Sequence, residues 1–246
     1  MTRIHVLADE TSLIVAAADF IRDRARQAIA ERGRFTIALA GGGTPKPVYE
    51  RLATEPYLRD IEWQKVEIFF GDERCVAPDN PNSNWHMALT AFGKQLPIPD
   101  ANYHRMHGED PPEKAAQHYE DLLIRRFDGR LPARGFDLVV LGMGDNGHTA
   151  SLFPGLAAVT ETTRWVMAQY VERVGMWRLT LTPVVMNAAH CVMFLVVGGG
   201  KAAMVARVLE GPHQPVVLPS QAIVPTNGDL HWLLDAAAAA QLKSIS

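Results

Sequence analysis

Four short apolar runs constrain the fold of this chain more than any other feature. They are FTIALAGGG from Phe35, VEIFFGDE from Val66, FDLVVLGMG from Phe136 and CVMFLVVGGG from Cys191. Each run is continuous rather than alternating, which is typical of strands that are buried on both faces of a parallel sheet. Each run also ends in glycine or in an acidic residue, which indicates a turn at that point.

Helical patterns separate these runs and complete an alternation of strand and helix. They cover residues 12–32, 47–53, 85–92, 113–127 and 201–209, and the alanine-rich stretch DAAAAAQLK predicts a terminal helix. Crossovers of this kind build a doubly wound α/β fold, a mainly parallel, Rossmann-like sheet with helices on both faces. No repeat or long linker interrupts the pattern, so we expect a single domain over residues 1–246.

The composition is that of a globular protein, with 48% hydrophobic and 21% charged residues. A formal net charge of -3 gives no general attraction for nucleic acid or for an anionic membrane, so we expect neither as a partner. No apolar stretch reaches the roughly 20 residues that span a bilayer, and no signal segment opens the chain. Cys75 and Cys191 lack metal-site spacing, and a cytoplasmic location is the default expectation.

Ligands of open α/β sheets bind beyond the carboxyl ends of the strands, so the motifs that follow the runs are candidate sites. The first motif is AGGGTPKP, residues 40–47. Gly42 and Gly43 let the backbone approach a ligand, and Thr44 is placed to cap a helix that begins at Pro45. Free N–H groups at that helix end would face an anion, although a plain strand-to-helix turn fits as well. No Walker A pattern is present, so triphosphate binding is not favoured.

Charged residues follow the second and fourth runs. Asp72, Glu73 and Arg74 end the second run, where they form either a self-satisfying ion-pair network or part of a site. Arg74 is the better ligand candidate, because a guanidinium fork suits phosphate geometry. Lys201 follows the glycines of the fourth run and would supply a second positive charge, and Arg178 in RLTLTP is a further basic candidate.

The stretch GMGDNGHTASLFPG, residues 142–155, has two interpretations. Gly142, Gly144 and Gly147 spell G-x-G-x-x-G, but a dinucleotide fingerprint follows the first strand of its unit, and this one follows the third run. The other interpretation centres on His148. A ring at a helix N-terminus is kept neutral by the helix dipole and can act as a base, although a capping histidine is the simpler alternative.

Several familiar catalytic patterns are missing from the sequence. It contains no G-x-S-x-G elbow, no H-E-x-x-H pair and no C-x-x-C pair. We therefore expect neither a covalent serine mechanism nor a metal site.

In their order and spacing, the stretches AGGGTPKPVYERL, FFGDERCVAPDNPNSN, LGMGDNGHTASLFPG and VVGGGK resemble the 6-phosphogluconolactonase family of the glucosamine/galactosamine-6-phosphate isomerase superfamily. The resemblance spans nearly the whole chain. It implies hydrolysis of 6-phospho-D-glucono-1,5-lactone to 6-phospho-D-gluconate, the second step of the oxidative pentose phosphate pathway, without a cofactor or an obligate protein partner. It also implies catalytic roles for His148 and Asp72, and binding of the substrate and its phosphate by Gly42, Gly43, Thr44, Arg74, Asn84, Arg178 and Lys201.

Two other functions stay open. In the related amino-sugar-phosphate deaminases the histidine is followed by a pattern resembling GHIAFNEP, whose glutamate takes part in sugar ring opening; Phe153 stands there in this chain and cannot transfer protons. A non-catalytic sugar-phosphate sensor is the other alternative, and Asn146 is compatible with it because the lactonase pattern usually has Asp at this position. If that Asp orients the histidine, its role is here lost, shifted to Asp145 or taken by Asp72.

Overall fold

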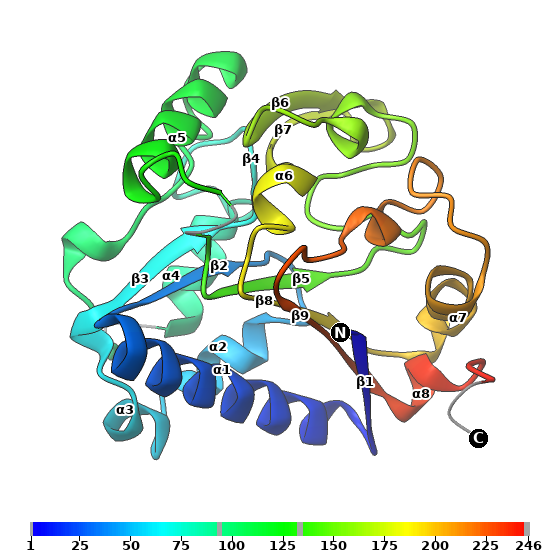
Figure 1. The fold of residues 1–246 in the computed structure, drawn as a ribbon, viewed down its shortest axis with the longest axis horizontal. Coiled ribbons are helices and arrows are strands. Elements are labelled where there is room, and N and C mark those ends of the chain that lie inside the picture. Colours follow the sequence, from blue (N-terminus) through cyan, green and yellow to red (C-terminus); the bar gives the residue numbers. More distant parts are fainter. Residues whose placement is uncertain (1, 93–94, 132–134, 244–246) are drawn as a thin grey trace.

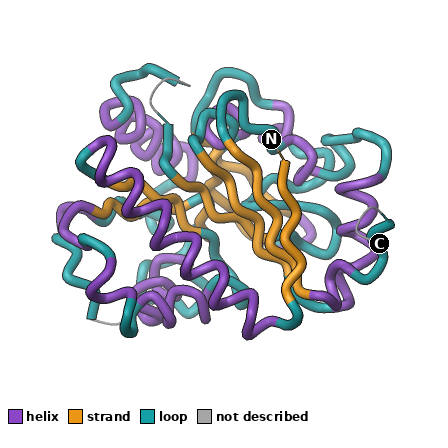
Figure 2. The backbone as a smooth tube through the Cα atoms, turned by 60° about the horizontal axis from the view of Figure 1, so that its bottom comes forward, coloured by secondary structure: helices purple, strands orange, loops and turns teal. Residues whose placement is uncertain are grey.

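The computed structural model describes residues 2–92, 95–131 and 135–243. Its main element is a six-stranded sheet in the order β1-β9-β8-β5-β2-β3, in which every neighbouring pair is parallel. Figures 1 and 2 show these strands side by side at the centre of the molecule. The strands are β1 (Thr2–Leu7), β2 (Phe35–Leu39), β3 (Val66–Phe70), β5 (Leu138–Gly142), β8 (Cys191–Val196) and β9 (Asp229–Asp235).

Alternate residues of the strands belong to two separate hydrophobic cores. Leu138 and Val140 of β5 pack into the core beneath the sheet in Figure 1, and Val139 and Leu141 pack into the core above it. Both faces are thus buried, as the continuous apolar runs predict. The expected doubly wound α/β fold is confirmed, and all four expected strands are present.

Helices cover both faces of the sheet. The lower core contains residues of α1 (Glu10–Arg32), α2 (Lys46–Leu52) and α4 (Asn84–Phe92), and the upper core contains residues of α5 (Pro112–Arg126) and α7 (Ala202–Glu210). These five helices match the expected ones to within two residues at each end. Three shorter helices are α3 (Tyr57–Asp60), α6 (Pro183–Met186) and α8 (Ala236–Ala239), and 3-10 turns occupy Trp63–Lys65, Asp100–Asn102, Ala157–Thr160, Glu172–Val174, Gly199–Lys201 and Pro219–Ala222.

A second, antiparallel sheet lies above the first and was not expected from the sequence. It contains β4 (Asp72–Arg74), β7 (Met176–Leu181) and β6 (Val166–Val171) in that order. Gly71 alone separates β4 from β3, and both of its backbone groups are bonded: its N–H donates to Leu39 O at 2.9 Å, and its carbonyl accepts from Leu181 N at 2.8 Å. Gly71 therefore ties the end of β2 to the end of β7.

Two local expectations were wrong. No helix follows Gly147, because residues 148–155 form a succession of turns and bridges. Helix α2 begins at Lys46 with Pro45 as its N-cap, and no side chain caps it, so Thr44 does not have the capping role assigned to it. The expected single domain over residues 1–246 stays a prediction.

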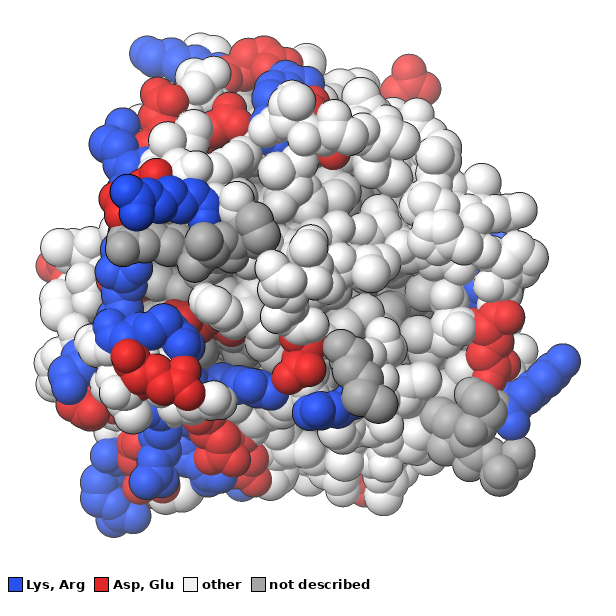
Figure 3. Space-filling model, viewed as in Figure 1, with Lys and Arg blue, Asp and Glu red and all other residues white. Residues whose placement is uncertain are grey.

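The described parts of the chain also bear on two broader expectations. Within them no helix is both long and apolar enough to cross a membrane, and no cluster of three or more potential metal-ligating side chains is found. On the face drawn in Figure 3, positive and negative side chains are intermixed, and most of them lie on its left side.

Candidate active site

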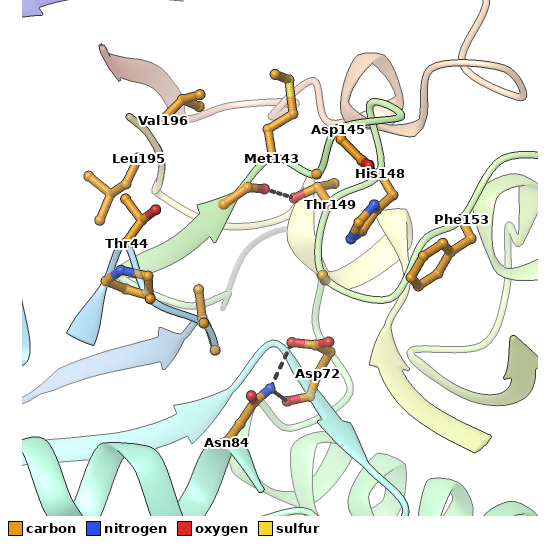
Figure 4. A pocket seen from close by; sticks show the side chains of 18 of the residues that line it. Thr44, Asp72, Asn84, Met143, Asp145, His148, Thr149, Phe153, Leu195 and Val196 are labelled. Atoms are coloured by element: carbon orange, nitrogen blue, oxygen red, sulfur yellow. Dashed lines mark hydrogen bonds between the residues drawn. The ribbon is translucent and has the colours of Figure 1, made fainter. Parts of the chain in front are cut away.

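A pocket of about 450 Å³ opens at the carboxyl ends of β2, β5 and β8. Its wall combines the segments that follow these strands with residues of the second sheet. In Figure 4, Thr44, Asp72, Asn84 and His148 surround one space, although they come from four different segments. The pocket brings together all nine residues expected at the site: Gly42, Gly43, Thr44, Asp72, Arg74, Asn84, His148, Arg178 and Lys201.

The glycine loop after β2 is held at its base and open at its tip. The hydroxyl of buried Tyr49 bonds both backbone groups of Ala40, at 3.0 Å each. A methyl group on Gly41 would overlap the amide of Asn84, whereas one on Gly42 or Gly43 would meet no atom within 4 Å. Gly42 also has a φ of 99°, which favours glycine. The loop can therefore lie against Asn84 while Gly42 and Gly43 face the pocket.

Asn84 links the carboxylate of Asp72 to the guanidinium group of Arg74. Its amide nitrogen donates to the Asp72 backbone oxygen at 2.8 Å and to Asp72 Oδ1 at 3.1 Å, as Figure 4 shows, and its amide oxygen accepts from Arg74 Nη1. Asp72 Oδ2 accepts from Ser151 Oγ at 2.7 Å. The carboxylate of Asp72 is thus buried and bonded on both oxygens, so its orientation is fixed.

Glu73 has a structural position beneath the site. It is 2% exposed and accepts hydrogen bonds from the backbone N–H groups of Arg74, Asn84 and Trp85 and from Ser83 Oγ. Burial raises the pKa of Glu73, although the bonds that its carboxylate accepts act in the opposite direction. Glu73 anchors the start of α4. The expected ion-pair network at this strand end is therefore a set of hydrogen bonds from uncharged groups.

Arg74 and Arg178 lie directly opposite each other on the antiparallel strands β4 and β7. Like charges in this position repel each other. Among the described residues neither of them, nor Lys201, forms an ion pair, and the Nε atoms of both arginines are buried without a hydrogen-bond partner. Burial also lowers the pKa of Arg178. This arrangement leaves three cations of one pocket with unused hydrogen-bonding capacity.

His148 is held on three sides. Its Nδ1 lies 2.6 Å from Asn146 Oδ1, its ring stacks on Phe153 at a centroid distance of 4.2 Å, and a methyl group on Gly144 would overlap the ring. Burial lowers the pKa of His148 to about 4, and the nearby cations Lys201 and Arg178 act in the same direction. The expectation of a neutral imidazole agrees with this, but the helix dipole invoked for it is wrong, because no helix starts there.

The side chain that orients the His148 ring is the one at position 146. Asp145 forms an ion pair with Arg173 at 2.8 Å, and Asp72 accepts hydrogen bonds from Ser151 and Asn84. Neither Asp145 nor Asp72 forms a hydrogen bond with His148, so the suggestion that one of them takes over this role is not supported. Asn146 makes the contact itself, as an amide.

Three pocket features escaped the sequence analysis. Arg173 lines the rim from the turn between β6 and β7, where ERVG gave no sign of a site. Ser151 belongs to a motif that was recognised, but its bond to Asp72 joins residues 79 positions apart. The fit between Gly41 and Asn84 depends on tertiary packing, and only the run of three glycines hinted at it.

A cationic pocket at the carboxyl edge of a parallel sheet, with a neutral imidazole in its wall, defines an α/β protein suited to an anionic small molecule. The pattern of the family described as glucosamine-6-phosphate isomerases/6-phosphogluconolactonase matches residues 8–232, and the chain belongs to this family.

Individual relatives agree with this assignment. The chain is 42% identical over 244 residues to a 6-phosphogluconolactonase of a Nostoc species, with 98% of each protein covered. It is 34% identical to the 6-phosphogluconolactonase of Haemophilus influenzae over 82% of this chain and 85% of that protein. The solved 6-phosphogluconolactonase of Trypanosoma cruzi superposes with a TM-score of 0.87 at 27% identity and covers 99% of this chain and 97% of its own. A monomeric glucosamine-6-phosphate deaminase shares the fold, with a TM-score of 0.82 at 21% identity, 97% of this chain and 99% of its own.

Proposed function

We propose that this protein hydrolyses 6-phospho-D-glucono-1,5-lactone to 6-phospho-D-gluconate. The observation that carries the proposal is that one pocket contains the neutral ring of His148 together with Arg74, Arg178 and Lys201, none of which forms an ion pair with a described residue. The three cations suit a phosphate dianion, and the imidazole suits the activation of water. The 42% identity to a protein named 6-phosphogluconolactonase, over 98% of both chains, supports the same activity.

The phosphate would bind among the cations. Arg74 and Arg178 project from neighbouring strands, and Lys201 enters from the start of α7. The backbone of Gly42 and Gly43 would contribute N–H donors. A dianion between the two arginines would replace their mutual repulsion by attraction, and the binding energy of this remote group would orient the lactone carbonyl.

The chemical step would take place beside His148. The neutral imidazole removes a proton from water as the water oxygen attacks C1, and a tetrahedral oxyanion forms. The bond between C1 and the ring oxygen then breaks, and the imidazolium returns its proton to that oxygen. The products are the C1 carboxylic acid, which ionises, and a free hydroxyl group. Asp72 would act through its fixed negative charge, which favours the transient imidazolium.

The geometry disfavours the deaminase alternative. Ring opening of an amino sugar needs an acid–base group near the ring oxygen, and the position of the expected glutamate holds Phe153, whose ring is stacked on His148. The acids that line the described pocket are Asp72 and Asp145, and the hydrogen bonds and the ion pair described above engage both.

One experiment separates the candidate functions. Freshly made lactone is supplied to the purified protein, and 6-phosphogluconate is followed by its coupled oxidation, with the spontaneous hydrolysis rate subtracted. Glucosamine 6-phosphate is tested alongside with detection of ammonia. We expect a lactone rate well above the background and no ammonia. Lactone binding without excess hydrolysis would favour the sensor, and release of ammonia would favour the deaminase.

A further inference from the structure

Two nitrogen atoms of His148 converge on one atom of Asn146. The backbone nitrogen of His148 lies 3.3 Å from Asn146 Oδ1, and its ring Nδ1 lies 2.6 Å from the same atom. A backbone N–H can only donate, so this end of the amide must be the oxygen rather than the NH₂ group. An oxygen can only accept, so Nδ1 must carry a proton. The backbone contact therefore fixes the orientation of the amide and, through it, the tautomer of the ring.

We propose that Asn146 is a positioning residue that holds His148 as the Nδ1–H tautomer and so presents Nε2 to the lactone-bound water as the proton acceptor. A neutral imidazole carries one proton, so a proton on Nδ1 leaves a lone pair on Nε2. This inference rests on the proposed hydrolysis for its role in catalysis, but the tautomer itself does not depend on any substrate.

The surroundings of Nε2 agree with this assignment. No described residue forms a hydrogen bond with Nε2, and this atom is not among the buried polar atoms that lack a partner, so it faces the open pocket. Gly144 lies against the ring, and Phe153 covers one of its flat sides. The ring cannot turn over without losing the Asn146 contact. Nε2 is thus the nitrogen left available for a water molecule.

The neutral amide has a second consequence for the ring. The charged groups that act on His148 are Asp72 from β4, Asp145 from its own loop, Lys201 from the start of α7 and Arg178 from β7. They are two anions and two cations, and Asp145 is already paired with Arg173. The imidazolium therefore has no carboxylate in direct contact. A carboxylate at position 146 would keep the bond to Nδ1 but would favour the charged ring, and so would reduce the fraction of free base.

The test combines ring-nitrogen spectroscopy with two substitutions at position 146, the near-isosteric Asn146→Asp and the truncation Asn146→Ala. Nitrogen-15 NMR of labelled protein reports the protonation of Nδ1 and Nε2, and the His148 signals are identified among the nine histidines by their loss in His148→Gln. In the parent we expect a protonated Nδ1 and an unprotonated Nε2 from about pH 5 to about pH 8. In Asn146→Asp we expect the same tautomer and a rise of about 1–3 units in the titration midpoint. Asn146→Ala should give mixed tautomers.

Activity provides the second readout. In Asn146→Asp the acid limb of the kcat/KM profile should move to higher pH with the ring titration, and Asn146→Ala should lose kcat with little change in KM. Asn227→Asp adds the same charge at an exposed position outside the pocket and should change neither readout. A protonated Nε2 in the parent, or a ring titration in Asn146→Asp equal to that of the parent, would overturn the proposal. Absence of lactone hydrolysis with the expected spectra would instead reject the proposed function and leave the tautomer established.

Discussion

Arg74 and Arg178 face each other across β4 and β7, and no carboxylate of the described residues pairs with either of them. Two guanidinium groups in a cross-strand pair repel each other, and the buried Nε atoms without partners add a desolvation cost. An anion bound between the two guanidinium groups, as we propose, would offset both costs. The same relationship predicts which substitutions will weaken substrate capture.

Replacing Arg178 with alanine should lower kcat/KM for the phosphorylated lactone roughly ten- to a hundredfold, because a hydrogen bond to a charged group is worth about 1.5–3 kcal/mol. Plain gluconolactone, which lacks the phosphate, should be hydrolysed about as slowly by the variant as by the parent. Initial rates on both lactones check the expectation.

The control for this variant is Arg59→Ala, which removes the same charge from a residue outside the pocket whose side chain is 74% exposed. It should keep the parent's preference for the phosphorylated lactone. A parent-like preference in Arg178→Ala would mean that Arg178 does not hold the phosphate.

Replacing His148 with alanine should lower kcat roughly 10²- to 10⁴-fold, the usual contribution of a general base, and leave KM within a few-fold. Saturation kinetics on fresh lactone measure both constants. Full kcat in this variant would remove His148 from the mechanism.

A methyl group at position 144 tests the placement of the same ring without removing it. In Gly144→Ala the added carbon overlaps the imidazole, so the ring must shift, and a shift of about 1 Å can cost about a hundredfold in kcat. Gly142→Ala is the matched control, because its methyl group meets no atom within 4 Å. Equal kcat values for the two alanine variants would show that the ring tolerates displacement.

Two buried histidines should make the protein less stable in mild acid. Burial lowers the pKa of both His148 and His231 to about 4, from an ordinary value near 6.5. Between these two pH values the unfolded chain binds protons that the folded chain does not. The free energy of unfolding is therefore largest above about pH 6.5 and falls as the pH drops towards 4, by up to about 1.4 kcal/mol per pH unit for each ring.

Urea unfolding of His231→Gln at several pH values checks this expectation. His231 lies on β9, is 2% exposed and is not among the residues that line the pocket. In His231→Gln, the slope of the unfolding free energy against pH should be smaller between about pH 6.5 and about pH 5. The decrease should be roughly the contribution of one proton-binding group. A slope identical to that of the parent would contradict the assignment for His231.

Glu73 should matter for stability and only indirectly for catalysis. In Glu73→Ala three backbone N–H groups and one hydroxyl group at the start of α4 lose their acceptor, so we expect the free energy of unfolding to fall by about 3 kcal/mol. Glu50→Ala removes an exposed carboxylate and should change it by less than about 0.5 kcal/mol. Urea unfolding of both variants compares them, and equal stabilities would mean that Glu73 does not anchor this segment.

The parallel sheet was predictable where its strands are buried on both faces. The runs at β2, β3, β5 and β8 are largely apolar, interrupted only by Thr36 in β2 and Glu67 in β3, and all four are strands. The edge strand β1 is largely exposed, and β9 carries His231 and acids at both ends, so neither has that pattern. The second sheet escaped because β4 has three residues, all charged, and is defined by its partner β7 rather than by its own sequence.

That the candidate residues share one pocket was predictable, but their contacts were not. Most of the expected residues follow a strand end that the fold brings to one edge, whereas Asn84 begins α4 and Arg178 lies within β7; all nine line the pocket. The neutrality of His148 was attributed to a helix dipole, whereas burial beside Phe153 produces it. Such effects arise from residues that meet only after folding, and no local pattern encodes them.

The bonds at Gly71 bear on how the pocket can move. A hinge needs backbone groups that exchange partners at little cost, yet the N–H of Gly71 is bonded to Leu39 and its carbonyl to Leu181. Any swing of the second sheet at this point would break one of these bonds. The two facing arginines therefore move with the parallel sheet, and the scaffold sets the distance between the proposed anion-binding wall and the imidazole before a ligand arrives.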